Sequence, residues 1–154
     1  MPFTSTLVPT GSLVPLMDNL VALEETVHPD LIVYRWRPRE FPQLDSGGAI
    51  YNWIGADTFQ VFDVAHWKDI VQIVVRAGIR HTDVNDEMAQ IEVYADAFRD
   101  VIDGALWRNQ PLGGAAKKGA RTGMRLTEDT FNTIPVLAIE FTLEFELLRT
   151  IPAR

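Results

Sequence analysis

The stretch that decides the fold reads LAIEFTLEFEL and occupies residues 137–147. Apolar side chains alternate along it with three glutamates and a threonine, which is typical of a β-strand with one face in a core and the other in water. Eleven residues at about 3.4 Å each span roughly 37 Å, longer than the usual strand of about 5–6 residues. We therefore expect at least one other long strand to pair with it.

Further strands are predicted upstream. The sequence VQIVVRAGI at residues 71–79 alternates in the same way, the β-branched and aromatic run at 31–36 favours a strand, and short strands are expected at 49–54 and near 121–126. The face of the sheet turned away from the core is then expected to carry Gln72, Arg76, Arg80, Glu140, Thr142, Glu144 and Glu146.

Two amphipathic helices are predicted, each with apolar residues at spacings of 3, 4, 3 and 4. The first lies within 12–27 and presents Leu13, Leu16, Leu20, Leu23 and Val27. The second follows an acidic cap at 83–87 and presents Met88, Ile91, Ala95, Phe98 and Ile102. Both apolar stripes need a cover, so we expect an α+β fold, with two helices on one face of a mostly antiparallel sheet of four to five strands.

A single domain is expected over residues 1–154, with three segments outside this pattern. They are an N-terminal arm at 1–11, an inserted irregular segment at 37–68 and a basic flexible loop at 108–127. The arm lacks the charge and apolar run of a signal peptide, and no apolar run reaches the ~18–20 residues of a membrane span. No membrane association is therefore expected.

The loop at 108–127 is strongly basic. It has no acidic residue and carries +5, so the rest of the chain must carry −12 to reach the total of −7. A long glycine-rich connection inside a compact domain is uncommon, and ordering against a partner would explain it. The residues expected to contact that partner are Lys117, Lys118, Arg121 and Arg125.

Residue types that carry chemistry are sparse. The absence of cysteine excludes disulfides, thiolate metal sites and cysteine nucleophiles. His28, His66 and His81 lie in three different settings without metal-ligand spacing, so no metal site is expected. The sequence GGAAKKG at 113–119 lacks the Lys-Ser/Thr ending of a phosphate loop, and no nucleophile elbow is present. We expect no cofactor, no catalytic residues and no enzyme activity.

The glutamates of the last strand leave two interpretations open. In one, they belong to a solvated face on which Arg76 and Arg80 pair with some of them across strands. In the other, Glu140, Glu144 and Glu146 line a space occupied by a polyanion that must not adhere, because like charges repel within about 8–10 Å.

The chain resembles the tail terminator (tail completion) proteins of long-tailed, non-contractile bacteriophages, the lambda-type family of small ring-forming α+β proteins. The matching features span most of the chain. They are its length, the helix at 12–27 leading to LIVYRW at 31–36, IVQIVVRAG at 70–78, IEVYADAFRD at 91–100 and IPVLAIEFTLEF at 134–145.

This resemblance implies a virion protein assembled in the host cytoplasm as a homo-oligomeric ring, generally a hexamer. The ring caps the tail tube protein, ends tube polymerisation and joins the tail to the head-completion proteins of the neck, and DNA passes through its lumen without specific binding. We expect the three glutamates to face that lumen and the four basic residues to reach a neighbouring ring or protomer. Two alternatives remain: another ring protein of the same particle, such as the tube subunit or a neck connector, and a small enzyme or ligand-binding domain with an acidic cleft near Trp53, His66 or Trp67.

Overall fold

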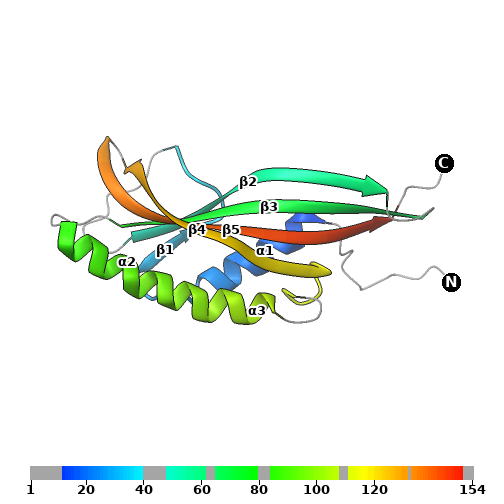
Figure 1. Cartoon of the computed structure of the whole chain (residues 1–154), viewed down its shortest axis with the longest axis horizontal. Helices are drawn as coiled ribbons and strands as arrows, with labels where there is room; N and C mark the ends of the chain where they lie inside the picture. Colours follow the sequence, from blue (N-terminus) through cyan, green and yellow to red (C-terminus); the bar gives the residue numbers. More distant parts are fainter. Residues whose placement is uncertain are drawn as a thin grey trace.

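The computed structural model describes residues 12–39, 48–61, 65–79, 84–107, 111–131 and 133–150. A five-stranded sheet with the strand order β1-β2-β3-β5-β4 has its helices on one face (Figure 1). This confirms the predicted α+β fold. The elements are α1 (Leu13–Glu24), β1 (Leu31–Tyr34), β2 (Gly48–Val61), β3 (His66–Ile79), α2 (Val84–Phe98), the π-helical turn η1 (Arg99–Asp103), α3 (Gly104–Leu106), β4 (Lys118–Phe131) and β5 (Ile134–Thr150).

Strand β5 lies between β3 and β4 and pairs antiparallel with both. Its register with β3 runs without a shift from His66 opposite Thr150 to Ile79 opposite Leu137. Strands β2 and β3 are also antiparallel, and only the short β1 runs parallel to its neighbour. The expectation that the last strand needs a long partner is therefore confirmed, since β3 is 14 residues long and β5 is 17.

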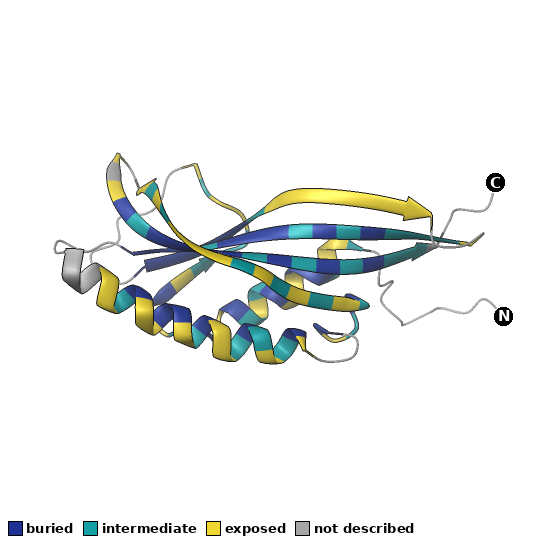
Figure 2. Ribbon diagram, viewed as in Figure 1, coloured by how far each residue is buried: buried dark blue, intermediate teal, exposed yellow. Residues whose placement is uncertain are grey.

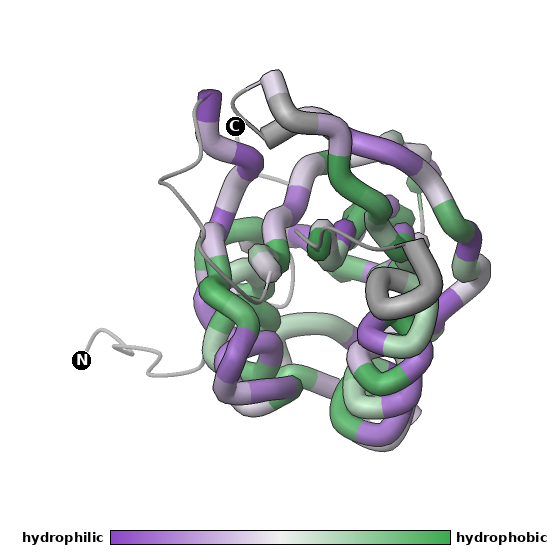
Figure 3. The backbone as a smooth tube through the Cα atoms, turned by 90° about the vertical axis from the view of Figure 1, so that its left-hand side faces the viewer, coloured by the Kyte–Doolittle hydropathy of each residue, from purple (hydrophilic) through white to green (hydrophobic). Residues whose placement is uncertain are grey.

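The main core lies between the sheet and the helices. Alternate residues of β3 and β5 point into it, and the ring of Phe98 on α2 stacks on Phe141 with centroids 3.9 Å apart. Met88 and Leu13, at the beginnings of the two predicted apolar stripes, are 39% and 37% exposed, so this part of the prediction is wrong. Seen end-on, α1 and α2 lie side by side beneath the sheet (Figure 3).

The sequence predicted an irregular segment at 37–68. This prediction is wrong for β2 and for the first residues of β3, which form regular strands. The hydropathy of β2 shows no two-residue period because the strand passes from a buried to an exposed environment along its length. Its first five residues are all buried, whereas residues 54–61 are all exposed (Figure 2). Residues 40–47 and 62–64, and the arm at 1–11, lie outside the described residues.

The prediction of a flexible loop at 108–127 is wrong from Lys118 onward, where β4 forms an edge of the sheet and contains the short strand expected near 121–126. Lysine and arginine are common on edge strands because their charges keep other strands away. Residues 111–115 form a turn in which Gly113 and Gly114 adopt φ values of 68° and 86°, which glycine tolerates at little cost. The side-chain amide of Asn19 on α1 donates to the Leu112 carbonyl at 2.7 Å and attaches this turn to the first helix.

No helix in the part of the chain that the structure describes is long and apolar enough to cross a membrane.

Candidate functional site

The face of the sheet that points away from the helices carries a polar row across four strands. The register places Tyr51 of β2 beside Arg76 of β3, and Arg76 beside Glu140 of β5. Arg125 of β4 completes the row on the far side of Glu140. The Nε atoms of Arg76 and Arg125 donate to the two carboxylate oxygens of Glu140, at 2.7 and 2.8 Å. We call these four residues the cross-strand row.

Glu140 is buried at the centre of this row, with 6% of its surface exposed. Burial alone would raise the pKa of Glu140, but the hydrogen bonds from Arg125 and Arg76 outweigh burial and hold this pKa below its usual value. The pairing of Arg76 with a glutamate of β5 is the cross-strand ion pair that the first interpretation of this face predicted. Arg80, the other arginine in that interpretation, lies outside the described residues.

A second carboxylate, Asp129 near the end of β4, binds groups from distant parts of the chain. Arg37 donates Nε to Oδ2 at 3.2 Å and Nη2 to Oδ1 at 2.8 Å. The Tyr51 hydroxyl also donates to Asp129, and Nη1 of Arg76 lies 3.5 Å from Oδ2. Burial acts to raise the pKa of Asp129, but hydrogen bonds from Arg37 and Tyr51 dominate and lower it to about 2.

The guanidinium groups at this end of the sheet are therefore compensated. Arg76 lies between Glu140 and Asp129 and also stacks over the ring of Trp53, 4.6 Å from its centroid. Both carboxylates have lowered pKa values, so neither holds the proton that a general acid needs. This arrangement fastens strands together, and each of the described arginines Arg37, Arg76 and Arg125 is paired with a carboxylate.

The other two predicted glutamates share the face with Glu140, at alternate positions along β5. Glu146 lies opposite Lys118 of β4, and one of its carboxylate oxygens is 3.7 Å from Nζ of Lys68. Glu144 lies opposite Ala120 and makes no ion pair with any residue that the structure describes. Of the three glutamates, Glu144 therefore keeps its negative charge least compensated.

The four predicted basic residues do not form one patch. Arg121 lies opposite the core residue Leu143, so it is on the helix side of β4, where its Nε donates to Oδ1 of Asp103 at 2.9 Å and its Nη2 to Oδ2 at 3.0 Å. Arg125 is on the other side and binds Glu140. Lys118 is exposed opposite Glu146, and the backbone N–H of Lys117 donates to the Glu146 carbonyl at 2.9 Å.

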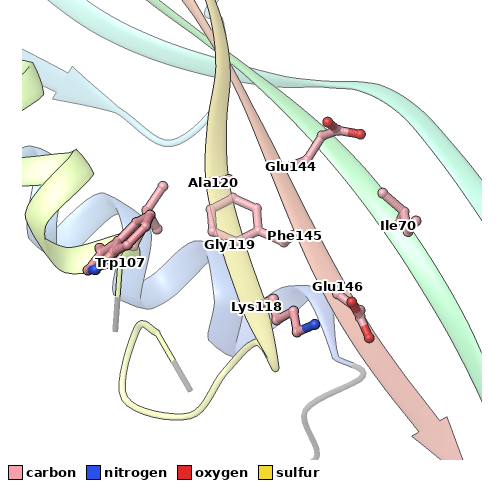
Figure 4. A pocket seen from close by; sticks show the side chains of 9 residues that line it. Ile70, Trp107, Lys118, Gly119, Ala120, Glu144, Phe145 and Glu146 are labelled. Carbon is pink, nitrogen blue, oxygen red and sulfur yellow. The ribbon is translucent and has the colours of Figure 1, made fainter. Parts of the chain in front are cut away.

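A hollow of about 470 Å³ opens at the beginning of β4 (Figure 4). The indole of Trp107, 91% exposed, stands on one side of it, at the end of the last helical turn. Lys118, Glu144 and Glu146 lie on the other side of the strand. A Cβ on Gly119 would come within 3.0 Å of the Phe145 ring, so the small residue allows that ring to pack beneath β4.

A buried polar pair joins α1 to β2. The side chains of Glu24 and Asn52 are both 0% exposed, and Nδ2 of Asn52 donates to Oε1 of Glu24 at 2.7 Å. The remaining oxygens, Oε2 of Glu24 and Oδ1 of Asn52, have no hydrogen-bond partner among the described residues. Burial raises the pKa of Glu24 to about 8, more than the Asn52 hydrogen bond lowers it, so this carboxyl is protonated at neutral pH. The neutral carboxyl carries a proton that it can donate, which a carboxylate could not.

Three of the residues that organise this region were missed in the sequence. Asp129 and Arg37 meet across 92 positions, which leaves no local pattern to detect. Glu24 did leave a local pattern, because it follows Leu20 by four residues on the buried side of α1. An acidic residue at a core position of a helix predicts either a charge partner or a neutral carboxyl.

The described residues contain no group of three or more His, Asp or Glu side chains placed to hold a metal ion. In comparisons with known proteins, no family model matches the sequence, and no curated protein matches it either.

Proposed function

We propose that this chain is a ring-forming structural protein of a long-tailed, non-contractile bacteriophage, the tail terminator. In this proposal it forms a homohexamer at the head-proximal end of the tail tube, ends tube polymerisation and joins the tail to the neck. The tail tube protein and a head-completion protein are its partners, and DNA passes through the ring.

The observation that carries the proposal is the charge balance on the helix-free face of the sheet. Arg76 and Arg125 are bound by Glu140, Lys68 lies near Glu146, and Glu144 has no cationic partner among the described residues. A face of this kind has no surplus of cations to retain a polyanion, because binding to duplex DNA depends on cations that displace its counterions. Facing a lumen, it would let DNA pass without adhering.

The resemblance in sequence also supports the proposal, since it rests on the helices and strands at 12–27, 31–36, 70–78, 91–100 and 134–145. Fewer of the four predicted basic residues remain available for the partner contact that the sequence assigned to them. Arg121 and Arg125 already bind Asp103 and Glu140 within the chain, so Lys118 is the residue that we propose to reach a neighbouring ring or protomer.

The test is the mass of the purified protein in solution by light scattering, over a range of concentrations and salt, with negative-stain images of the same sample. We expect closed rings of fixed size, and in a second step we expect these rings to stop the growth of tail tubes when added to polymerising tube protein. Protein that grows into tubes by itself would indicate the tube subunit. A monomer at every concentration that neither binds nor caps tubes would overturn the proposal and favour a ligand-binding domain.

A further inference from the structure

The sheet has two unpaired edges, one on each side (Figure 1). On one side, β1 pairs with β2 only from Gly48 to Tyr51, and no described strand lies beyond residues 54–61 of β2. On the other side, β4 pairs with β5 along its length and has no described strand on its outer side. Each edge presents a row of backbone N–H and C=O groups that another strand could pair with.

The β2 edge has little protection against such pairing. Ile54, Phe59 and Val61 are 46%, 50% and 68% exposed, and Asp57 is the only charged residue of the 54–61 segment. A bulge at Gly55 is the one protective device there, whereas edges that must stay unpaired usually also carry lysine or proline. A long, exposed edge with apolar side chains is typical of a strand that pairs with a strand of another chain.

The two edges differ in charge. Residues 118–125 at the beginning of β4 contain three cationic side chains, Lys118, Arg121 and Arg125, and no acidic one. Arg121 is on the helix side of the sheet, as is Asp57, whereas Lys118 and Arg125 are on the helix-free side. Two β4 edges placed together would bring like charges close to each other, whereas β4 beside the β2 edge would bring Arg121 close to Asp57. Pairing of unlike edges is therefore favoured over a two-fold contact of β4 with itself.

Strand direction favours the same arrangement. Strand β2 is antiparallel to β3, β3 to β5, and β5 to β4, so β2 and β4 run in opposite directions. Rotation about an axis roughly parallel to the strands keeps each strand's direction, so β4 of one copy would meet β2 of the next as an antiparallel pair. Each copy then uses each edge once, and a head-to-tail contact of this type closes into a ring when the rotation between copies divides a full turn evenly.

Exposed apolar side chains also match across this contact. Phe59 and Val61 lie opposite Asp69 and Trp67 of β3, on the helix side of the sheet, where no helix covers them. On the same side of β4, Trp107 stands 91% exposed beside the hollow at Gly119 and Ala120. With β2 of one copy beside β4 of the next, Phe59 and Val61 would approach this indole.

We infer that the exposed edge of β2 around Ala56 pairs antiparallel with the edge of β4 around Ala120 in a second copy of this chain, and that this pairing is the protomer contact of the ring. The inference rests on the proposed function for the ring itself and adds the surfaces that build it. It also gives a partner to the exposed part of β2, which begins beyond the residues that pair with β1.

Cross-linking tests this contact cleanly because the chain has no cysteine. Along the sheet, Ala56 of β2 is level with Gln72, Glu144 and Ala120 of β4, and both alanines are exposed on the helix-free face. The variants are Ala56→Cys and Ala120→Cys, treated with a bis-maleimide of about 10 Å span, which tolerates a stagger of two residues, or about 7 Å, between copies. The control is Val93→Cys on the outer side of α2, which is 50% exposed.

We expect a covalent dimer when Ala56→Cys and Ala120→Cys proteins are mixed and none when either is treated alone. The double variant should give a ladder of products that ends at the ring size, and Val93→Cys paired with either should give no dimer. A dimer from Ala120→Cys alone would overturn the inference in favour of a two-fold contact. Closed rings without any cross-link would overturn it while leaving the ring function in place, and a protein that never assembles would contradict both.

An independent readout comes from Trp107→Ala and Phe59→Ser. Both should raise the concentration at which rings form at least tenfold, while circular dichroism and thermal unfolding of the monomer stay close to wild type for Trp107→Ala, whose side chain is almost fully exposed. Ring formation by Trp107→Ala at the wild-type concentration would remove the indole from the contact.

Discussion

The hydroxyl of Tyr51 donates a hydrogen bond to Asp129, although β2 and β4 are separated in the sheet by β3 and β5. Three strand spacings of about 4.8 Å amount to roughly 14 Å, so the two side chains meet only because the sheet coils strongly at this end. At the other end, β2 and β4 diverge (Figure 1). The contact therefore fixes the curvature of one end and leaves the other end open.

Asp129→Asn should destabilise the protein by about 2–4 kcal/mol, because Arg37 and Tyr51 lose their charged acceptor while both stay in place. Urea unfolding at pH 7 measures this loss. Asp96→Asn is the matched control, since that carboxylate is 78% exposed and its nearest cation, Arg99, is 3.9 Å away. Equal midpoints for the two variants would show that the Asp129 network contributes nothing.

The lowered pKa of Asp129 predicts that the folded protein loses stability in acid. The pKa of Asp129 is about 2 in the folded protein and 3.8 in the reference state, so its stabilisation is fully present above about pH 4 and is lost as the pH falls through about 2. We expect wild type to lose about 2 kcal/mol more than Asp129→Asn over this range. Parallel stability curves for the two proteins between pH 5 and pH 2 would contradict this assignment.

The raised pKa of Glu24 predicts the opposite dependence of stability on pH, in a higher pH range. Its pKa is about 8 when folded and 4.5 in the reference state, so the stability it confers is fully present below about pH 4.5 and is lost as the pH rises through about 8. Glu24→Gln keeps a hydrogen-bond donor at this position and removes the titration, so it should be more stable than wild type by a few kcal/mol at pH 9. Urea unfolding at pH 5 and pH 9 measures the difference.

Glu92→Gln, at an exposed position of α2, is the control for this measurement and should follow wild type at both pH values. If Glu24→Gln is less stable than wild type at pH 9, the carboxyl of Glu24 is ionised and usefully paired, and the neutral pair with Asn52 is wrong.

Glu140 and Glu144 should respond differently to the same substitution. Glu140→Gln leaves Arg76 and Arg125 without their shared carboxylate and should cost about 1–3 kcal/mol, whereas Glu144→Gln should change stability by less than about 0.5 kcal/mol. Thermal unfolding of both variants, checked for reversibility, gives the comparison. A Glu144→Gln loss as large as that of Glu140→Gln would mean that Glu144 also has a structural partner.

Loss of negative charge from the same face should change DNA binding. The double variant Glu144→Gln with Glu146→Gln should still form rings but bind duplex DNA more tightly than wild type at low salt, because Lys68 and Lys118 lose their nearby carboxylate. Retention measured at low and high salt tests this, with Glu92→Gln on the helix side as the control. Unchanged retention would count against a lumen position for this face.

The salt dependence of assembly should depend on Lys118. Replacing Lys118 with Ser should weaken association with tail tubes and make it less dependent on salt, without removing the ion pairs of Arg121 and Arg125. Sedimentation with preformed tubes measures this association. Arg121→Ser is the informative companion, because its main effect should be to loosen η1 by losing Asp103.

The helices and strands that could be predicted from the sequence are those whose environment stays the same along their whole length. Strand β5 and residues 71–79 keep one face buried throughout, so period-two hydropathy revealed them, and the helices revealed themselves by period 3.6. Strand β2 passes from complete burial to complete exposure, and β4 is an edge rich in glycine and cations, so neither shows that period. The pairing of Arg76 with a β5 glutamate was accessible because both lie on predicted strands, whereas the choice of Glu140 as that partner needed the register.

The position of β5 in the sheet also sets an order of folding. Strand β4 pairs only with β5 among the described strands, and β5 supplies one entire side of β3, yet β5 is made after both. A nascent chain that has produced residues 1–131 therefore holds β4 with no strand to pair with and β3 with one edge bare. The native sheet has high contact order and must close in a late step, so we expect slow folding and a need for protection from aggregation while the chain is being synthesised.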